Sequence, residues 1–174
     1  MKPLEIQQIT QLPSQIHVLE MQAAEEGFRF LKRLIVEWGS GANRFDAPGE
    51  CLMVASLDGC LIGIGGVSVD PYMQNGVGRL RRLYVSPVAR RQNVGRVLVE
   101  RLVEHAAGHF RIVRLSTDTT DGDAFYLQCG FRRTNEEGAT ISWSLVVKFF
   151  DTVRCDRMGK AFGEPLARPP LLSG

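Results

Sequence analysis

The stretch "YVSPVARRQNVGRVLVE", from Tyr84 to Glu100, decides how the middle of this chain folds. It opens as a predicted strand that ends near Val85 and continues as a predicted helix that begins near Asn93. The segment between them, Arg90 to Asn93, is a polar turn rich in hydrogen-bond donors. Because the first N–H groups of a helix have no partner within the helix, such a turn favours binding of an anion. The alternative is a solvated connection whose basic residues serve solubility.

Length and composition indicate one globular domain. The chain has 174 residues, of which 44% are hydrophobic, and a net charge of +2. Its apolar runs are too short to span a membrane and no leader opens the chain, so we expect a cytoplasmic protein without a membrane partner. The small net charge argues against a nucleic-acid partner. The spacing of the four cysteines is typical of neither a metal site nor a disulfide framework.

The distribution of charge is more informative than its sum. Between positions 79 and 96 there are six arginines and no Asp or Glu; they are Arg79, Arg81, Arg82, Arg90, Arg91 and Arg96. Because this basic segment is confined to one strand and one turn, it favours a compact polyanion over a long duplex.

Hydrophobic periodicity predicts the elements before this segment. Residues 14–38 have helical spacing, and Gly27 divides them into two helices. Two apolar runs flank the turn dipeptide Asp58-Gly59 and predict a hairpin of strands near 51–57 and 60–69. The glycines at 63, 65 and 66 lie inside a strand with no helix after it, which indicates close packing or a bulge rather than a nucleotide site.

The remaining elements complete an α/β (α+β) fold in one domain. The sequence predicts a strand over 79–86, an amphipathic helix over 94–107, a strand over 111–117, a short helix over 121–130 and a terminal strand over 139–147. We therefore expect a mixed, mostly antiparallel sheet with helices on both faces. We assign residues 1–147 to this domain and 148–174 to a tail, which we expect to pack in a homodimer.

Three short segments carry a family resemblance. "RRQNVG" at 90–95 matches an acyl-CoA signature, Arg/Gln-x-x-Gly-x-Gly/Ala, and "LYVSP" precedes it. "FYLQCGF" at 125–131 matches a Tyr-x-x-x-Gly-Phe element. On these residues the sequence resembles the GNAT superfamily of N-acetyltransferases from about residue 4 to residue 147. The resemblance implies acetyl-CoA as co-substrate, and the spacing of the cysteines leads us to expect no metal.

The resemblance also implies roles for individual residues. It implies that Tyr126 protonates the departing CoA thiolate, a task that suits a phenol with an ordinary pKa of about 10; a tyrosine packed on the sheet is the alternative. It implies that the cofactor is bound by Leu83, Tyr84 and Val85 through their backbone, by Arg90, Arg91, Gln92, Asn93, Val94, Gly95 and Arg96 around the pyrophosphate, and by Thr119 near the pantetheine.

Two departures from the family pattern affect the chemistry. Asn93 replaces the first glycine of the signature, but asparagine tolerates left-handed backbone better than most residues. Arg79 stands where the family often has a glutamate base, and a guanidinium suggests recognition of a carboxylate or other anion in the acceptor. A solvated strand arginine is the alternative. Glu26 and Trp38 lie where the family shapes the acceptor pocket; a surface charge and core packing are the alternatives.

By this resemblance the protein is an N-acetyltransferase in which a small-molecule or peptide amine attacks acetyl-CoA directly in a ternary complex. A non-catalytic acyl-CoA-binding sensor or partner module is the alternative, because the glutamate and one glycine of the pattern are replaced. Cys129 is expected to be a core thiol rather than a nucleophile.

Overall fold

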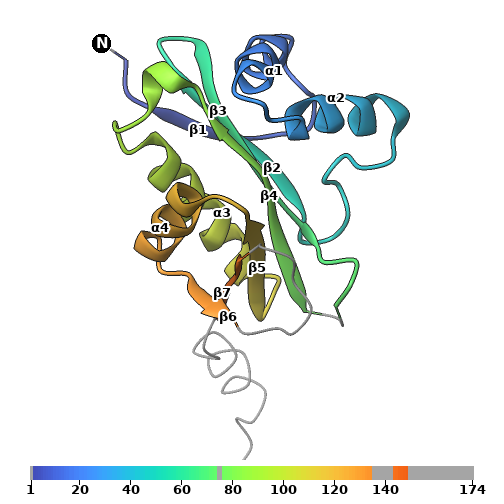
Figure 1. Cartoon of the computed structure of the whole chain (residues 1–174). Coiled ribbons are helices and arrows are strands. Elements are labelled where there is room, and N and C mark those ends of the chain that lie inside the picture. Colours follow the sequence, from blue (N-terminus) through green and yellow to red (C-terminus); the bar gives the residue numbers. More distant parts are fainter. Residues whose placement is uncertain (1, 74–75, 135–142, 149–174) are drawn as a thin grey trace, which may run out of the picture.

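The computed structural model describes residues 2–73, 76–134 and 143–148 (Figure 1). In chain order the elements are β1 (Glu5–Ile9), α1 (Ile16–Glu25), α2 (Phe30–Ser40), β2 (Cys51–Leu57), β3 (Cys60–Val69), β4 (Val77–Val85), the 3-10 turn η1 (Pro87–Ala89), α3 (Val94–Ala107), β5 (Ile112–Thr117), α4 (Thr120–Gln128), β6 (Arg132–Thr134) and β7 (Trp143–Lys148). The predicted bounds of β2, β3 and α3 agree with these.

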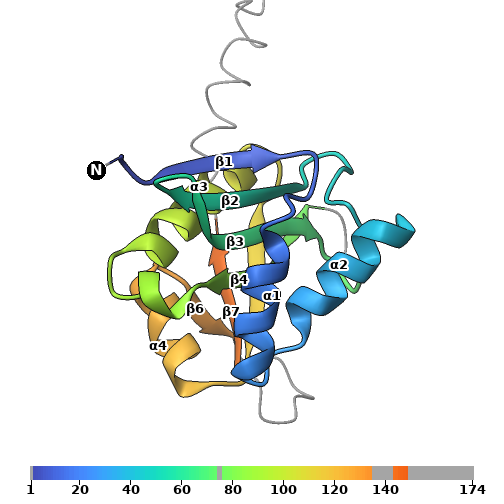
Figure 2. The same ribbon diagram turned by 90° about the horizontal axis from the view of Figure 1, so that it is seen from above.

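The strands form one mixed sheet in the order β1-β2-β3-β4-β5-β7-β6. Neighbouring strands are antiparallel except β4 and β5, which are parallel. Helices α1 and α2 cover one face, and α3 and α4 lie on the other (Figure 2). This arrangement confirms the predicted mixed, mostly antiparallel sheet with helices on both faces.

Two apolar clusters hold these layers together. On one face α3 contributes Leu98 and Leu102 to a cluster with Val113 of β5. On the other face Leu19 and Leu34 bring α1 and α2 against β2 and β3. Each fully buried leucine stabilises the fold by about 1.5–3 kcal/mol relative to an exposed one. The sheet is therefore fixed from both sides around its centre.

The glycines of β3 are explained by packing. A Cβ atom added to Gly66 would lie 2.5 Å from a ring carbon of Phe45, and one added to Gly65 would lie 2.8 Å from Leu83. The turn before them has positive φ angles at both Asp58 (51°) and Gly59 (79°), as a tight hairpin requires. The predictions of a hairpin and of close packing are confirmed.

Strand β4 is irregular in a way that positions the candidate site. On the β3 side, Gly66 pairs with Arg81 but Ile64 pairs with Tyr84, so β4 carries one extra residue there, and Arg82 has a φ of 60°. On its other side, β4 pairs with β5 only over residues 77–79. From Leu80 onward, the backbone edge of β4 that faces away from β3 has no β5 partner.

The sequence prediction missed the first strand. The chain begins with β1, which pairs with β2 at the edge of the sheet, rather than with a helix. Its sequence, "EIQQI", has only two apolar residues, because an edge strand buries little of either side. The predicted strand over 139–147 is described only from Trp143. Ile141, Phe149, Phe150 and the rest of the tail lie outside the described residues, as does the expected dimer contact.

Candidate active site

The turn before α3 has the backbone of an open helix N-terminus. Asn93, the N-cap, is left-handed with φ 61° and ψ 7°, and its side chain makes no capping hydrogen bond. The first α3 bond runs from the Val97 N–H to the Asn93 carbonyl over 3.0 Å. Within the described part of the chain, the N–H groups of Val94, Gly95 and Arg96 donate to no acceptor. These donors are available to an anion.

Gly95 lets α3 begin in close contact with its neighbours. A Cβ atom added there would lie 3.3 Å from the Phe125 ring and 3.5 Å from a Val85 methyl. The free end of α3, the end of β4 and helix α4 therefore meet at this glycine. A Cβ atom at position 95 would require the Phe125 ring to shift by a few tenths of an ångström.

The Arg90 side chain is bound to neighbouring residues of the protein. Its Nε donates to the Val85 carbonyl over 3.0 Å, and one terminal nitrogen donates to both carboxylate oxygens of Glu26 at 2.9 and 2.8 Å. Its guanidinium carbon lies 5.5 Å from the centre of the Tyr84 ring, and the Tyr84 hydroxyl donates to Glu26 over 3.2 Å. Arg90 and Glu26, which the sequence assigned to cofactor and acceptor respectively, thus form one contact that links the turn to the end of α1.

The other long side chains of the turn differ in their contacts. Gln92 donates to the Val88 carbonyl over 3.0 Å, and Arg96 forms an exposed ion pair with Glu100 over 3.1 Å. Arg91 has a left-handed backbone, with φ 61°, and its guanidinium has no hydrogen-bond or ion-pair partner among the described residues. Its positive charge is the one in the turn that no described carboxylate offsets.

Tyr126 is half-buried between α4 and the sheet. Its ring centre lies 5.1 Å from that of Phe125 and 5.8 Å from that of Phe131, and it packs on the same cluster as Leu83 of β4. Burial raises the pKa of the Tyr126 phenol well above its ordinary value. Burial, with the nearby Glu26 carboxylate, also raises the pKa of Tyr84 to about 12. Both phenols therefore keep their protons at neutral pH.

The N-terminus of α4 is closed by its own residues. The Thr119 hydroxyl accepts a hydrogen bond from the Gly122 N–H over 3.1 Å, and Asp121 and Asp123 lie in the first turn. Asp123 also pairs with Arg133, and this hydrogen bond holds the pKa of the carboxyl below its ordinary value. Thr119, expected near the pantetheine, therefore caps a helix.

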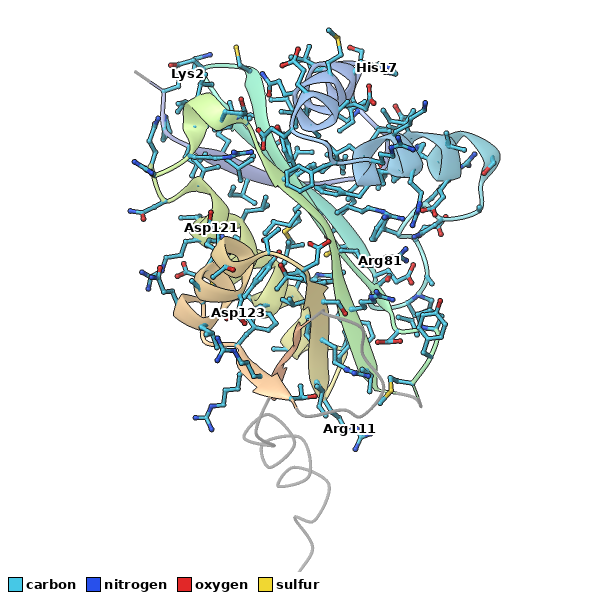
Figure 3. The ribbon with its side chains drawn as sticks, viewed as in Figure 1. Lys2, His17, Arg81, Arg111, Asp121 and Asp123 are labelled. Carbon is cyan, nitrogen blue, oxygen red and sulfur yellow. The ribbon has the colours of Figure 1, made fainter. Side chains whose placement is uncertain are left out.

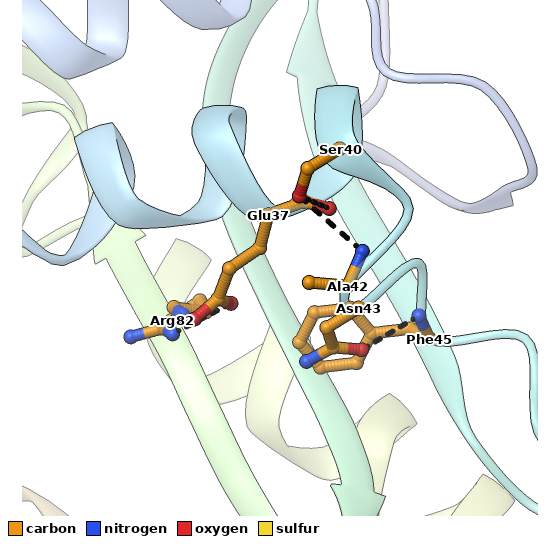
Figure 4. Close-up of polar contacts among 6 residues, drawn as sticks. All are labelled: Glu37, Ser40, Ala42, Asn43, Phe45 and Arg82. Carbon is orange, nitrogen blue, oxygen red and sulfur yellow. Dashed lines mark hydrogen bonds and ion pairs between the residues drawn. The ribbon is translucent and has the colours of Figure 1, made fainter.

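The acceptor-side candidates lie on the face covered by α2. The Arg79 guanidinium carbon is 6.0 Å from the Tyr72 ring centre, while Trp38 is partly buried against the α1–α2 cluster. A further pair on this face was not predicted from the sequence. Arg82, only 9% exposed, donates to Glu37 of α2 over 3.0 Å (Figure 4). No local pattern joins two residues so far apart in the chain.

The described residues also form a further pocket, but they include no metal-binding group and no membrane-spanning helix. A shallow pocket of about 350 Å³ is lined by Ile6, Gln8, Met53, Arg101, Glu104 and His105, away from the segments described above. In the part of the chain that the structure describes, no three His, Cys, Asp or Glu side chains are grouped to hold a metal ion. None of the described helices is both long and apolar enough to cross a membrane.

Solved structures with the same fold come from several bacteria. A protein from Exiguobacterium sp. 255-15 has a TM-score of 0.73 at 23% identity, over 90% of this chain and 99% of that one. An acetyltransferase from Streptococcus agalactiae 2603 has a TM-score of 0.67 at 18% identity, over 85% of this chain and 99% of that one. At these identities the likeness establishes the fold alone.

Sequence comparison identifies the family of the chain as well as its fold. An "IAA acetyltransferase" of Azospirillum brasilense is 35% identical over 59 residues, which are 34% of this chain and only 37% of that protein. The model of the acetyltransferase (GNAT) family matches residues 14–131. This match spans both helical layers, the open turn before α3 and the Tyr126 segment. The chain therefore belongs to the acetyltransferase (GNAT) family.

Proposed function

We propose that this protein is an N-acetyltransferase that moves an acetyl group from acetyl-CoA to an amine bound beside it in a ternary complex. The observation that carries the proposal is that two stretches of backbone near the end of β4 are left open, apart from the Val85 carbonyl, which accepts from Arg90. One is the open N-terminus of α3, and the other is the edge of β4 from Leu80 to Val85 that β5 leaves unpaired.

The open turn suits the diphosphate of the co-substrate. The N–H groups of Val94, Gly95 and Arg96 are free among the described residues, and the uncompensated Arg91 guanidinium adds positive charge beside them. A helix N-terminus favours an anion both by its free donors and by its dipole. In this proposal Arg90 acts through its backbone and through the contacts that hold the turn, since its side chain is bound to Glu26.

The free edge of β4 suits the amide groups of a pantetheine arm. An unpaired strand edge binds extended amide chains through main-chain hydrogen bonds, as in strand addition. We assign this contact to the backbone of Leu83, Tyr84 and Val85. Acetyl-CoA supplies the activated acetyl thioester. A backbone N–H near Val85 would stabilise the negative charge that develops on the thioester oxygen.

Tyr126 is the proposed general acid. Burial raises its pKa, so the phenol is protonated at neutral pH, which is the state that can donate to a departing thiolate. Its packing on the same cluster as Leu83 brings it to the side of β4 that carries the thioester in this proposal.

Among the described residues, the charged groups considered on the acceptor side are poorly suited to act as the base. Arg79 cannot accept a proton at neutral pH, and Glu26 and Glu37 are each bound to an arginine. We therefore assign the proton of the amine to water. Burial raises the pKa of the Cys129 thiol, which disfavours the thiolate that an acyl-enzyme pathway would need.

The test is an acetyl-transfer assay with an unbiased set of amines. Purified protein, acetyl-CoA and each amine are incubated, and both the released CoA thiol and the N-acetyl product are measured, the product by mass spectrometry. We expect product with at least one class of amine. Tight CoA binding without product from any amine would instead support the non-catalytic sensor, a reading that Arg79 in place of a glutamate favours.

A further inference from the structure

Three arginines of β4 gather on the face that α1 and α2 cover. Leu80 packs into the cluster on the α3 side, so its neighbours Arg79 and Arg81 face the other way. The extra residue in β4 then turns Arg82 to the same face, where it reaches Glu37 of α2. Figure 3 labels Arg81 on the side of β4 below α2, away from the α4 residues Asp121 and Asp123.

This cluster carries more positive than negative charge. The charges that act on Arg81 are the guanidiniums of Arg82, Arg79 and Arg33 and the single carboxylate of Glu37. Burial, and then the neighbouring guanidiniums, lower the pKa of Arg81 from its ordinary value. Like charges held half-buried on one surface repel one another, and a bound anion would relieve that repulsion.

Two buried polar atoms on the same face also lack partners. The Arg82 Nε has no hydrogen-bond partner among the described residues, and neither has the Ser68 hydroxyl. Ser68 of β3 lies directly across from Arg79 in the register. Arg82 is fixed by Glu37, so it supports the surface, while the half-buried Arg79 and Arg81 retain some exposure. The guanidiniums of Arg79 and Arg81 are therefore partly accessible on this face, beside the fixed side chain of Arg82.

The position of the cluster places it near the proposed reacting centre. Arg79 is the last β4 residue paired with β5, and the free edge begins immediately after it. Arg81 and Tyr84 are three positions apart, which is at most about 10 Å along a strand. An arginine side chain is long enough to cover much of that distance.

We propose that the acceptor is an amine that also carries an oxyanion, a carboxylate or a phosphate, bound by Arg79 and Arg81. The inference rests on the proposed function and names the substrate class for that site. The planar guanidinium matches either oxyanion through paired N–H donors. A polycationic amine would instead meet the excess of positive charge around Arg81.

The test compares matched amines. The arms are the L-amino acids, their primary amides, O-phosphoethanolamine with ethanolamine, and spermidine. We expect kcat/KM to be about 10- to 100-fold higher for an acid than for its amide, because a charge-assisted pair is lost in the amide. Comparing O-phosphoethanolamine with the amino acids shows whether the site prefers a phosphate or a carboxylate. Spermidine should be the poorest acceptor.

Variants assign the preference to the cluster. Arg79→Gln and Arg81→Gln should raise KM for the charged acceptor about tenfold or more and abolish its advantage over the amide. Arg101 is an exposed residue of α3, so Arg101→Gln removes the same charge elsewhere on the molecule. This variant should change neither the KM for the charged acceptor nor the preference for the acid over the amide. Melting curves exclude unfolding, and the CoA affinity of each variant should equal that of the wild type.

The outcomes separate the two proposals. Product from spermidine or from amides as readily as from acids overturns the anionic acceptor and leaves the acetyltransferase standing. Failure to bind CoA overturns the proposed function itself. If CoA binds but nothing is acetylated, calorimetry of the CoA complex with the amino acids decides: binding that Arg81→Gln abolishes supports the anion site, and its absence overturns it.

Discussion

Helices α3 and α4 begin at the same end of the molecule's central strands, yet their N-termini differ. At α4 the Thr119 hydroxyl accepts from Gly122, and Asp121 and Asp123 supply negative charge. At α3 the N-cap Asn93 makes no side-chain bond, and the first turn contains no acid. One N-terminus is satisfied by its own residues, and the other leaves its donors free.

The difference shows what a capped helix and an anion site each require. A cap of Ser, Thr or Asp stabilises a helix by about 1 kcal/mol, and acids in the first turn complement its dipole. The start of α3 has neither a side-chain cap nor an acid in its first turn, and its N-cap, Asn93, is in a left-handed conformation. We infer that α3 contributes backbone donors to binding and that α4 contributes the Tyr126 side chain to turnover.

The largest expected effect is the fall in kcat when Tyr126 of α4 is changed. Tyr126→Phe keeps the packed ring and removes the proposed proton donor, so kcat should fall about 10²–10⁴-fold. The CoA affinity, measured by calorimetry, should stay within about twofold. Unchanged kcat would remove Tyr126 from the mechanism, and lost affinity would make its hydroxyl a structural contact.

The pH dependence of kcat sharpens the same point. Burial raises the pKa of the Tyr126 phenol, and an acid with a raised pKa stays protonated to higher pH. The kcat measured at saturating substrate should therefore not decline between pH 7 and about pH 10 through loss of this proton. A decline centred near pH 8 or 9 in the wild type that disappears in Tyr126→Phe would contradict the assignment.

Next in size is an acid placed in the first turn of α3. Arg96→Glu changes an exposed side chain and puts a carboxylate beside the free amides, where it repels phosphate and competes for the donors. CoA should bind about 10- to 100-fold more weakly at low salt. Thr120→Glu, which places an acid in the first turn of α4 with a charge change of one rather than two, should leave the affinity within about twofold. Equal losses in both would mean that the two N-termini do not differ in function.

A smaller effect concerns the left-handed N-cap. Asn93→Ala should lower stability by about 1–2 kcal/mol, because alanine tolerates a left-handed backbone at φ 61° less well than asparagine does. For a chain of this size 1 kcal/mol lowers Tm by about 2–4 °C. Asn93→Gly should keep Tm within about 2 °C and keep or improve CoA affinity. A large loss of affinity in the glycine variant would mean that the asparagine side chain contacts the cofactor.

The smallest effect belongs to the closed N-terminus. Thr119→Ala removes the hydroxyl that caps α4 and should cost about 1 kcal/mol, seen as a Tm about 2–4 °C lower. Thr119→Ser restores the hydroxyl and should recover most of the loss. CoA affinity should change little in either variant. A strong loss of affinity in Thr119→Ala alone would assign the residue to cofactor binding.

Much of the fold could be predicted from local patterns. The bounds of α3, β2 and β3 follow from apolar periodicity and from the Asp58-Gly59 turn, because each of these signals is contained in a few consecutive residues. β1 could not be predicted, because its stability comes from pairing with β2 rather than from its own apolar residues. The extra residue in β4 could not be predicted either, because it is defined only by the register of β4 with β3.

The candidate site was predictable only in part. The turn at 90–96 follows from its signature, and the left-handed Asn93 agrees with the expectation for asparagine. The direction of the Arg90 side chain does not follow, because Glu26 and Tyr84 approach it only in the folded chain. The same is true of the pair between Arg82 and Glu37, which tertiary packing alone brings together.

The central claim is that the open N-terminus of α3 binds the diphosphate of acetyl-CoA. The direct measurement is calorimetry of the wild-type protein with CoA, with dephospho-CoA, which lacks only the 3′-phosphate, and with pantetheine, which lacks the diphosphate and the rest of the nucleotide, at several salt concentrations. CoA should bind about 100-fold or more tightly than pantetheine, and the difference should shrink as salt rises, because salt screens exposed charges. Equal affinities for CoA and pantetheine, or a CoA affinity that salt does not change, would contradict the account.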